Sequence, residues 1–274
     1  MSVLIGTSGW SYPSGKGTWN GVFYPKPRPR GFDELRYYAE RFGSVEVNST
    51  FYRMPEVALS EGWLRRTPDD FQFAIKLYQK FTHPEMYLKR GGVSDWDVSR
   101  VDVELFREGI KPLVGAGRLA ALLVQFPSSF HDQTATRDYL AWLLEAFRGL
   151  PMAVELRHRT WFADGAGTED LLTSLGAAWV AGDSPVSRNE SQGDAGSLLY
   201  VRLHGRNTAN WWQHEHAEDR YNYSYSAEEL TPFADRARRA TAAGKRVAIY
   251  FNNHFSAKAV ANADVLRAQV GNLI

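Results

Sequence analysis

The chain has 274 residues, and its 32 lysines and arginines nearly balance 31 aspartates and glutamates, which leaves a formal charge of +1. This balance argues against a protein that coats nucleic acid or an anionic membrane, and the absence of cysteine excludes disulfides, thiolate metal sites and a cysteine nucleophile. No apolar stretch reaches the roughly 20 residues that span a bilayer, and the first ten residues lack the pattern of a secretion signal. We therefore expect a cytoplasmic globular protein with no membrane segment.

Eight short apolar segments recur along the chain at strand length. Helical periodicity or turn residues separate them, and several alternate apolar with polar residues. The predicted strands cover residues 3–8, 44–48, 71–76, 119–125, 152–157, 177–181, 198–204 and 246–252.

Helices with their own start signals lie between these strands. Asp33 is a predicted N-cap. Ser99 with Asp102, and Ser226 with Glu229, have the three-residue spacing of a capping box. Strands that alternate with helices are typical of parallel sheets with crossover connections.

Eight strand–helix units in about 270 residues match the usual size of a closed (β/α)8 barrel of the TIM type. We therefore predict an α/β protein in which residues 1–274 form one closed parallel barrel as a single domain. The alternative is an open doubly wound sheet, but the strands of such a sheet normally read as continuous apolar runs.

The polar residues of the alternating strands share one phase. Because side chains alternate between the two faces of a strand, apolar residues under the outer helices would leave the polar set pointing into the barrel. Its last members would lie at the carboxyl ends of the strands, where barrel active sites form. The set comprises Glu46, Asn48, Lys76, Gln125, Glu155, Arg157, Asp183, Arg202, His204, Tyr250 and Asn252.

Several short motifs do not match the sites that they superficially suggest. The glycine-rich residues 15–21 are not a phosphate-binding loop, since Lys16 is followed by glycine rather than Ser or Thr. The run His214-Glu215-His216 lacks metalloprotease spacing, and Ser8 is not in a nucleophile elbow. His83 and His158 are interpreted as surface or loop residues.

Eight sequence blocks occur in order along nearly the whole chain: GTSGWSYP, WNGVFYP, SVEVNSTFYRMP, FQFAIK, LLVQFPSSF, AVELRHRTW, YVRLHGR, and YFNNH followed by ANAD. Together they resemble the YecE-like family, known as domain of unknown function 72. The resemblance implies a TIM-type barrel, in agreement with the strand count, and implies no particular activity. Residues 184–197 match none of the blocks and are predicted to form a polar loop.

The charge of the predicted cavity points to an anionic ligand, because three cations outnumber two carboxylates if His204 is neutral. We predict a small anionic metabolite, phosphorylated or sugar-like, and general acid–base catalysis. The predicted catalytic residues are Lys76, Glu46, Glu155 and His204, and the predicted substrate-binding residues are Asn48, Arg157, Arg202, Tyr250, Asn252 and Trp10. Arginine neighbours would lower the proton affinity of Lys76 and prepare it as a base or imine-forming nucleophile. The sequence leaves open whether the protein is an enzyme, and it identifies no cofactor.

Three other interpretations use the same residues. In a structural ion-pair network, Lys76 would pair with one glutamate and Arg202 with the other. In a glycosidase-like site, the two glutamates would be the catalytic pair, and a sugar platform or a hydrophobic lid would be formed by Trp10, Trp19, Phe23, Tyr24 and Phe51. A metal site would use Glu46, Glu155, Asp183 and His204, although the nearby cations disfavour it.

A non-enzymatic alternative is a nucleic-acid or nucleotide-binding protein that stacks bases on aromatic side chains and holds phosphates with arginines. The residues concerned are Trp211, Trp212, Tyr221, Tyr223, Tyr225, Arg206 and Arg220. The net charge of +1 makes nucleic acid the less favoured partner.

Overall fold

Strands and helices alternate in the computed structural model, which describes residues 3–91, 96–185, 187–188, 193, 195–209, 211 and 215–273. All eight predicted strands are present, and the sixth continues as β7 after the single residue Val180. The strands in this part of the chain are β1 (Val3–Thr7), β2 (Ser44–Val47), β3 (Gln72–Lys76), β4 (Leu119–Gln125), β5 (Met152–Glu155), β6 (Ala177–Trp179), β7 (Ala181–Ser184), β8 (Ser187–Arg188), β9 (Leu198–Leu203) and β10 (Arg246–Phe251).

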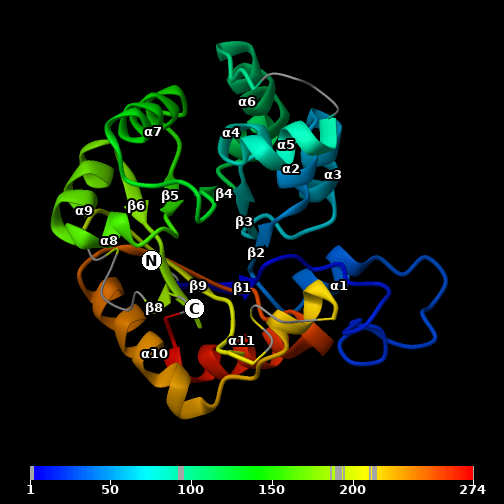
Figure 1. Ribbon diagram of the computed structural model, residues 1–274. Helices are drawn as coiled ribbons and strands as arrows, with labels where there is room; N and C mark the ends of the chain where they lie inside the picture. Colours follow the sequence, from blue (N-terminus) through cyan, green and yellow to red (C-terminus); the bar gives the residue numbers. More distant parts are fainter. Residues whose placement is uncertain are drawn as a thin grey trace.

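Helices surround the strands in the view of Figure 1. The α-helices among the described residues are α1 (Glu34–Ala39), α2 (Ser49–Tyr52), α3 (Val57–Arg65), α4 (Gln79–Thr82), α5 (Pro84–Gly91), α6 (Arg100–Gly115), α7 (Thr134–Ala146), α8 (Thr160–Ala163), α9 (Gly165–Ser174), α10 (Ala227–Ala242) and α11 (Lys258–Val270), and the 3-10 helices are η1 (Ala217–Tyr221) and η2 (Phe255–Ala257). Asp33 caps α1 as predicted, and both predicted capping boxes are confirmed, at the starts of α6 and α10.

The strands pair in two five-stranded sheets. One has the order β2-β3-β4-β5-β6 and is parallel throughout; the other has the order β1-β10-β9-β7-β8 and is parallel except for β8, which pairs antiparallel with β7. The predicted α/β architecture with parallel strands is confirmed. The pairing does not confirm one closed barrel, because it divides the strands between two sheets.

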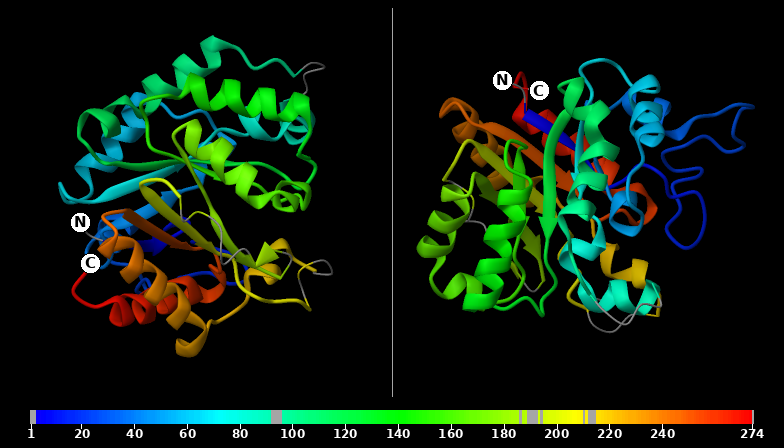
Figure 2. Two further views of the ribbon diagram at one scale, coloured as in Figure 1. Left: turned by 90° about the vertical axis from the view of Figure 1, so that its left-hand side faces the viewer. Right: turned by 90° about the horizontal axis from the view of Figure 1, so that it is seen from above.

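The two sheets meet at both of their edges, and Figure 2 shows them from two further directions. Ser8, directly after β1, forms an isolated parallel bridge with Glu46 of β2, and the Gly9 N–H donates to the carbonyl oxygen of Glu46 at 2.8 Å. At the other edge, β6 belongs to one sheet and β7 to the other. The intervening Val180 donates its N–H to the carbonyl oxygen of Val154 at 2.9 Å.

The alternating sequence pattern separates two buried clusters. The large core under the helices includes Phe73 and Ile75 of β3. The opposite strand faces, from both sheets, form a second cluster that includes Ala74 and Tyr200. Lys76 and Arg202 follow these last two residues by two positions and therefore lie on the same strand faces. The polar residues thus continue the second cluster toward the carboxyl ends of the strands, as predicted.

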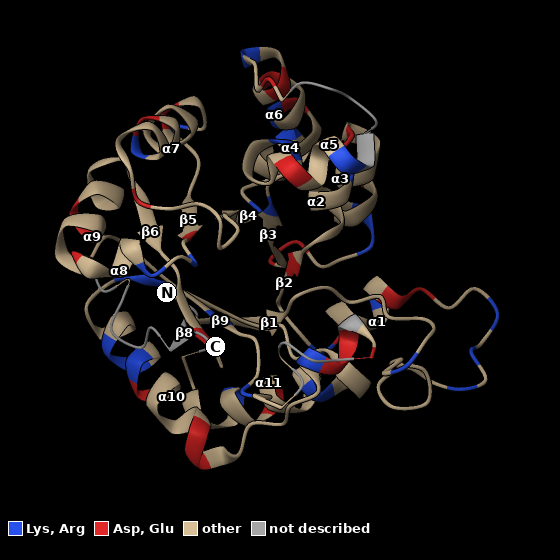
Figure 3. Cartoon of the chain, viewed as in Figure 1, with Lys and Arg blue, Asp and Glu red and all other residues tan. Residues whose placement is uncertain are grey.

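Charged residues of both signs lie on the outer helices (Figure 3). Of the predicted polar loop 184–197, residues 186, 189–192 and 194 lie outside the described residues, and the short strand β8 lies within it. Over the described ranges, no helix combines the length and hydrophobicity needed to cross a membrane.

Candidate functional site

A cavity of about 670 Å³ opens at the carboxyl ends of the strands. Residues at or directly after the ends of strands from both sheets line it. Six predicted site residues are among them, namely Trp10, Asn48, Lys76, Arg157, Arg202 and Asn252. The other four do not line the cavity: Glu46, Glu155, His204 and Tyr250, each at most 6% exposed. The cavity therefore presents cations and amides, and the carboxylates lie behind them.

Arg202 joins the two buried glutamates. Its Nη2 and Nε donate to the two carboxylate oxygens of Glu46 at 2.7 and 3.0 Å, and its Nη1 donates to Oε2 of Glu155 at 2.5 Å. Tyr200 donates its hydroxyl to Glu46 at 2.7 Å. With Arg202 only 1% exposed, this geometry is the charge-assisted, bidentate pairing that buried ions require.

The arginines keep both glutamates ionised. Burial by itself raises the pKa of Glu46, but the charge and hydrogen bonds of Arg202 outweigh it, and the pKa lies below the ordinary value. Burial acts in the same direction on Glu155, and Arg157 and Arg202 together hold its pKa well below the ordinary value. Two carboxylates in this state accept hydrogen bonds and have no proton to donate near neutral pH.

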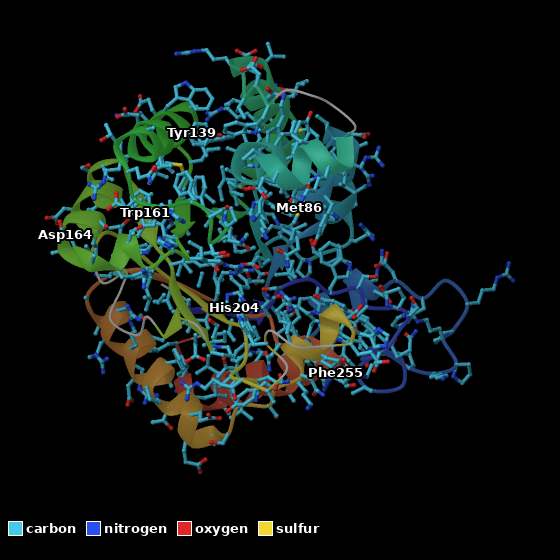
Figure 4. All side chains as sticks on the ribbon, viewed as in Figure 1. Met86, Tyr139, Trp161, Asp164, His204 and Phe255 are labelled. Atoms are coloured by element: carbon cyan, nitrogen blue, oxygen red, sulfur yellow. The ribbon has the colours of Figure 1, made fainter. Side chains whose placement is uncertain are left out.

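Arg202 and Glu155 share one hydrogen-bonded network as predicted, whereas His204 lies beside it, because its Nε2 has no hydrogen-bond partner among the described residues. Its Nε2 lies 3.5 Å from Oε1 of Glu155, and that carboxylate oxygen also accepts from Arg157 Nε at 2.7 Å. Asn252 lies 3.0 Å from the other ring nitrogen, Nδ1, and since an amide N–H can only donate, Nδ1 is the acceptor. Burial lowers the pKa of His204, and Glu155 offsets part of this effect. In Figure 4, His204 lies near the centre of the molecule.

Lys76 does not pair with a glutamate, so the predicted ion-pair network is wrong in this respect. Its Nζ donates to Gln125 Oε1 at 2.7 Å and lies 4.0 Å from the centre of the Phe51 ring. Burial, followed by the charges of Arg202 and Arg157, lowers the pKa of Lys76 to about 7. Both glutamates form ion pairs with Arg202, and the hydrogen-bond partner of Lys76 is the side-chain amide of Gln125.

His83 was interpreted as a surface or loop residue; it lies in a loop, but it is also a cavity residue that was not predicted. It lines the cavity, lies 2.8 Å from Thr82 Oγ1 through Nδ1, and meets the Phe51 ring edge-on at 4.8 Å. Burial, followed by the charge of Lys76, lowers the pKa of His83 to about 3. The available signal was its position just after the strand that ends in Lys76, because strand-to-helix loops build the active sites of barrels.

Aromatic rings form one wall of the cavity. Tyr12 and His254 stack with their ring centres 4.4 Å apart, and Tyr221 lies 4.9 Å from His254 on a tilt of 37°. Trp10 and Phe51 also line the cavity. The sequence analysis missed Tyr12 and His254 as lining residues.

The rest of the predicted sugar platform is wrong, because its residues are packed in the core. Trp19, Phe23 and Tyr24 are at most 7% exposed. The Trp19 indole donates to the carbonyl oxygen of His254 at 2.6 Å, and Phe23 packs edge-on against Tyr37. These three rings belong to the large core cluster.

Tyr250 is also buried too deeply to contact a ligand in the cavity. It is 0% exposed, belongs to the second cluster, and its hydroxyl lies 2.6 Å from Ser44 Oγ. Tyr250 lies two positions before Asn252 on the same inner strand face. The predicted strand face is therefore right, but the side chain lies below the cavity and does not line it.

The predicted metal set is split. Asp183 is fully buried and accepts hydrogen bonds from Arg206 and Tyr225 at 2.7 and 2.8 Å, in a separate network from Glu46 and Glu155. Within the described ranges, no three His, Asp or Glu side chains come together in a group suited to a metal ion.

The predicted base-stacking surface is largely occupied by the protein itself. Tyr225 is 4% exposed, and Tyr223 donates to Glu229 at 2.6 Å. Arg206 is bound to Asp183. Tyr221 and Arg220 line the cavity instead, with Trp211 edge-on to Tyr221, and Trp212 lies outside the described residues.

Residues 4–273 match the family model described as protein of unknown function DUF72. The chain belongs to the DUF72 family. Relatives include the UPF0759 protein YunF of Bacillus subtilis (strain 168), which is 27% identical over 272 residues, or 95% of this chain and 92% of that protein. The UPF0759 protein YecE of Escherichia coli (strain K12) is 27% identical over 175 residues, or 63% of this chain and 55% of that protein.

Two crystal structures of DUF72 proteins have similar folds. The protein from Thermotoga maritima MSB8 is 32% identical with a TM-score of 0.79, and 96% of each chain is covered. The protein from Enterococcus faecalis V583 is 22% identical with a TM-score of 0.81, covering 98% of this chain and 95% of that one. The predicted family is confirmed. The DUF72 description states no reaction, so the chemistry must be argued from the cavity.

Proposed function

We propose that this DUF72 protein is an enzyme that binds a small anionic metabolite, phosphorylated or sugar-like, and transfers a proton on it. One observation carries the proposal: the cavity is lined by three arginines and one lysine, and none of its described lining residues is Asp or Glu. The arginines, which keep their charge, are Arg157, Arg202 and Arg220, and the lysine is Lys76. A concave site with charge of one sign attracts ligands of the other.

The residues divide into three roles in this proposal. Glu46 and Glu155 are positioning residues that hold Arg202 and Arg157 toward the ligand. Lys76, as a neutral amine near pH 7, is the proton acceptor. Asn48 and Asn252 offer amide groups at the rim, and the buried Oδ1 of Asn48 has no hydrogen-bond partner in the described structure.

The scaffold in this proposal is a single (β/α)8 barrel domain of residues 1–274, in the cytoplasm. Support for closure comes from the two edges where the sheets meet, since one is bridged at Ser8 and Glu46 and the other is crossed by a nearly continuous strand. A barrel gathers strand ends from all sides at one mouth, which accounts for a cavity lined from both sheets.

The alternatives have weaker support. A glycosidase pair needs one carboxyl group that stays protonated as the general acid, but the pKa of both Glu46 and Glu155 is lowered and both are bound to Arg202. The nucleic-acid interpretation has weaker support because three of its predicted contact residues make contacts within the protein: Tyr223, Tyr225 and Arg206.

Thermal melting with anions tests the proposal. Inorganic phosphate or a sugar phosphate should raise the melting temperature at constant ionic strength. Lys76→Met and Arg157→Met should reduce this rise, and Lys111→Met, the same change at a lysine that is 71% exposed on α6, should retain it. No stabilisation beyond that of chloride would overturn the proposal. Stabilisation by neutral sugars alone would favour the glycosidase pair, and steeply salt-dependent binding of oligonucleotides would favour a nucleic-acid partner.

A further inference from the structure

Lys76 has surroundings that favour a free amine over an ammonium ion. Its polar partner is the neutral Gln125, and no ion pair within 4.0 Å joins it to any described carboxylate. The face of the Phe51 ring, 4.0 Å from Nζ, attracts an ammonium ion, but it does not carry the full negative charge of a carboxylate. A solvated surface lysine would keep its charge, whereas this one is half-buried beside two arginines. The pKa of Lys76, lowered to about 7 mainly by burial, agrees with this geometry.

Gln125 and His83 fix the direction of the hydrogen bonds around this amine. Because Gln125 Oε1 accepts from Lys76, its Nε2 faces His83 Nε2 at 3.4 Å and donates toward it. His83 Nδ1 then carries the proton and donates to Thr82 Oγ1 at 2.8 Å. This chain leaves the nitrogen lone pair of a neutral Lys76 available to the cavity.

We propose that Lys76 is a nucleophile that forms an imine with the aldehyde or ketone group of a substrate that also carries a phosphate or carboxylate. The inference rests on the proposed function and names its substrate class. Arg157 would hold the anionic group, since guanidinium forks match phosphate and carboxylate geometry. Arg202, whose three nitrogens already donate to Glu46 and Glu155, would add its positive charge. Lys76 reaches the same cavity from β3 and meets the carbonyl group there.

The reaction balances with water as the only other participant. The lone pair of Nζ forms a bond to the carbonyl carbon, and the carbonyl π electrons move to oxygen, which takes up a proton while nitrogen gives one up. The hydroxyl group of this carbinolamine then leaves as water after a second protonation, and the C=N bond forms as nitrogen loses its remaining proton. Protons exchange with solvent in the open cavity, and no oxidant or reductant takes part. An imine makes the adjacent C–H bond acidic, which connects this step to proton transfer. Because Nζ is then part of the C=N bond, water in the open cavity takes this proton in place of the free amine.

Borohydride trapping tests the proposal with two probes, dihydroxyacetone phosphate and pyruvate, which distinguish a phosphate from a carboxylate ligand. We expect one reduced adduct per chain, mapped to Lys76 by peptide mass spectrometry and suppressed by inorganic phosphate. The other lysines of the same chain serve as internal controls, and Lys111→Met should retain the adduct. Labelling of Lys76 no faster than that of surface lysines with either probe would overturn the imine. The anion-induced rise in melting temperature tests anion binding independently, so that proposal could hold even if the imine did not form.

Gln125→Glu provides a test with little change in shape. A carboxylate 2.7 Å from Nζ would favour the ammonium ion, so trapping at pH 7 should slow by about tenfold or more, and the pH at which the rate is half-maximal should move upward by at least about one unit. In the wild type that midpoint should lie near the pKa of about 7. An unchanged pH profile in the variant would overturn the assignment of Lys76 as the nucleophile.

Discussion

Arg202 is the one cation in the described structure that contacts both buried glutamates. Glu46 receives two of its hydrogen bonds and Glu155 a third, and all three side chains are at most 7% exposed. Removing one partner from a buried ion cluster leaves the others uncompensated. Stability should therefore be more sensitive to Arg202 than to any exposed arginine.

Replacing Arg202 with Met should lower the free energy of unfolding by about 3–5 kcal/mol at neutral pH, because Glu46 would remain buried without a cation and Glu155 would keep only Arg157. The loss should shrink in acid: Arg202 contributes by holding the pKa of both glutamates low, and this contribution disappears as pH falls through the folded-state pKa values. Urea unfolding at several pH values measures both effects. Arg148→Met, at a side chain that is 72% exposed, should change stability by only about 0.5 kcal/mol. Equal effects for the two variants would contradict this account.

Lys76→Met should be more stable than the wild type at acidic pH, and the two proteins should differ little in stability at alkaline pH. The pKa of Lys76 falls from 10.5 to about 7 on folding, so between these pH values the unfolded chain binds a proton that the folded chain does not. Wild-type stability therefore rises with pH across this interval, and below it the folded protein must hold a buried ammonium ion. The difference in melting temperature between variant and wild type should be greatest near about pH 6 and decline toward pH 10. Lys111→Met should show a flat difference, and a flat difference for Lys76→Met would refute the buried amine.

The sequence predicted which residues converge, but it could not predict how they pair. Strand alternation places Lys76, Glu155 and Arg202 on one set of faces, and the structure agrees. The pairing depends on strand stagger and on side-chain reach, which decide that Arg202 contacts both glutamates and that Lys76 contacts Gln125. His83 was missed because a histidine in a loop has no periodic neighbours to show which way it faces.

At the level of elements, a close backbone approach lies where β1 meets β2. A Cβ added to Gly6 would lie 2.1 Å from the carbonyl oxygen of Ser44. Any side chain at this position would push the two strands apart. The junction between the sheets therefore requires glycine in β1.

Gly6→Ala should lower the free energy of unfolding by about 1–3 kcal/mol or more, because the backbone must shift to make room for the methyl group. Gly43→Ala is the matched control, since no atom lies within 4 Å of its added Cβ, and its effect should be within about 0.5 kcal/mol. Chemical denaturation compares the two variants. If Gly6→Ala were as harmless as its control, the sheets would not be held together tightly at this edge.

Long periodic elements were predictable and short ones were not. All eight strands were found from apolar patterning, whereas α2, α4 and α8 have four residues each and were not predicted. One turn of helix shows no repeat in the sequence, and its stability comes from tertiary contacts. The interruption at Val180 was also invisible, because the apolar run from Ala177 to Ala181 is continuous.

For the whole molecule, the alternation of strands and helices predicted the parallel sheets and the end at which the cavity opens. Whether the strands close into one ring depends on a few hydrogen bonds at each edge, and no sequence pattern encodes these. The antiparallel β8 follows from a hairpin with β7 that has no counterpart in a regular strand–helix repeat.

The first and last described residues are neighbours. The same fold could therefore form from a chain that begins and ends at a different point. β1 pairs in parallel with β10, the Val3 N–H donates to the carbonyl oxygen of Leu273 at 2.7 Å, and the two ends lie together in all three views of Figures 1 and 2. A circular permutant that joins the old ends through a short glycine–serine linker and opens the exposed turn between Ala116 and Gly117 should therefore fold and keep its stabilisation by phosphate. Circular dichroism melting with and without phosphate measures both properties. A permutant that stays unfolded would mean that connectivity, and not the pairing of neighbours around the sheets, determines this architecture.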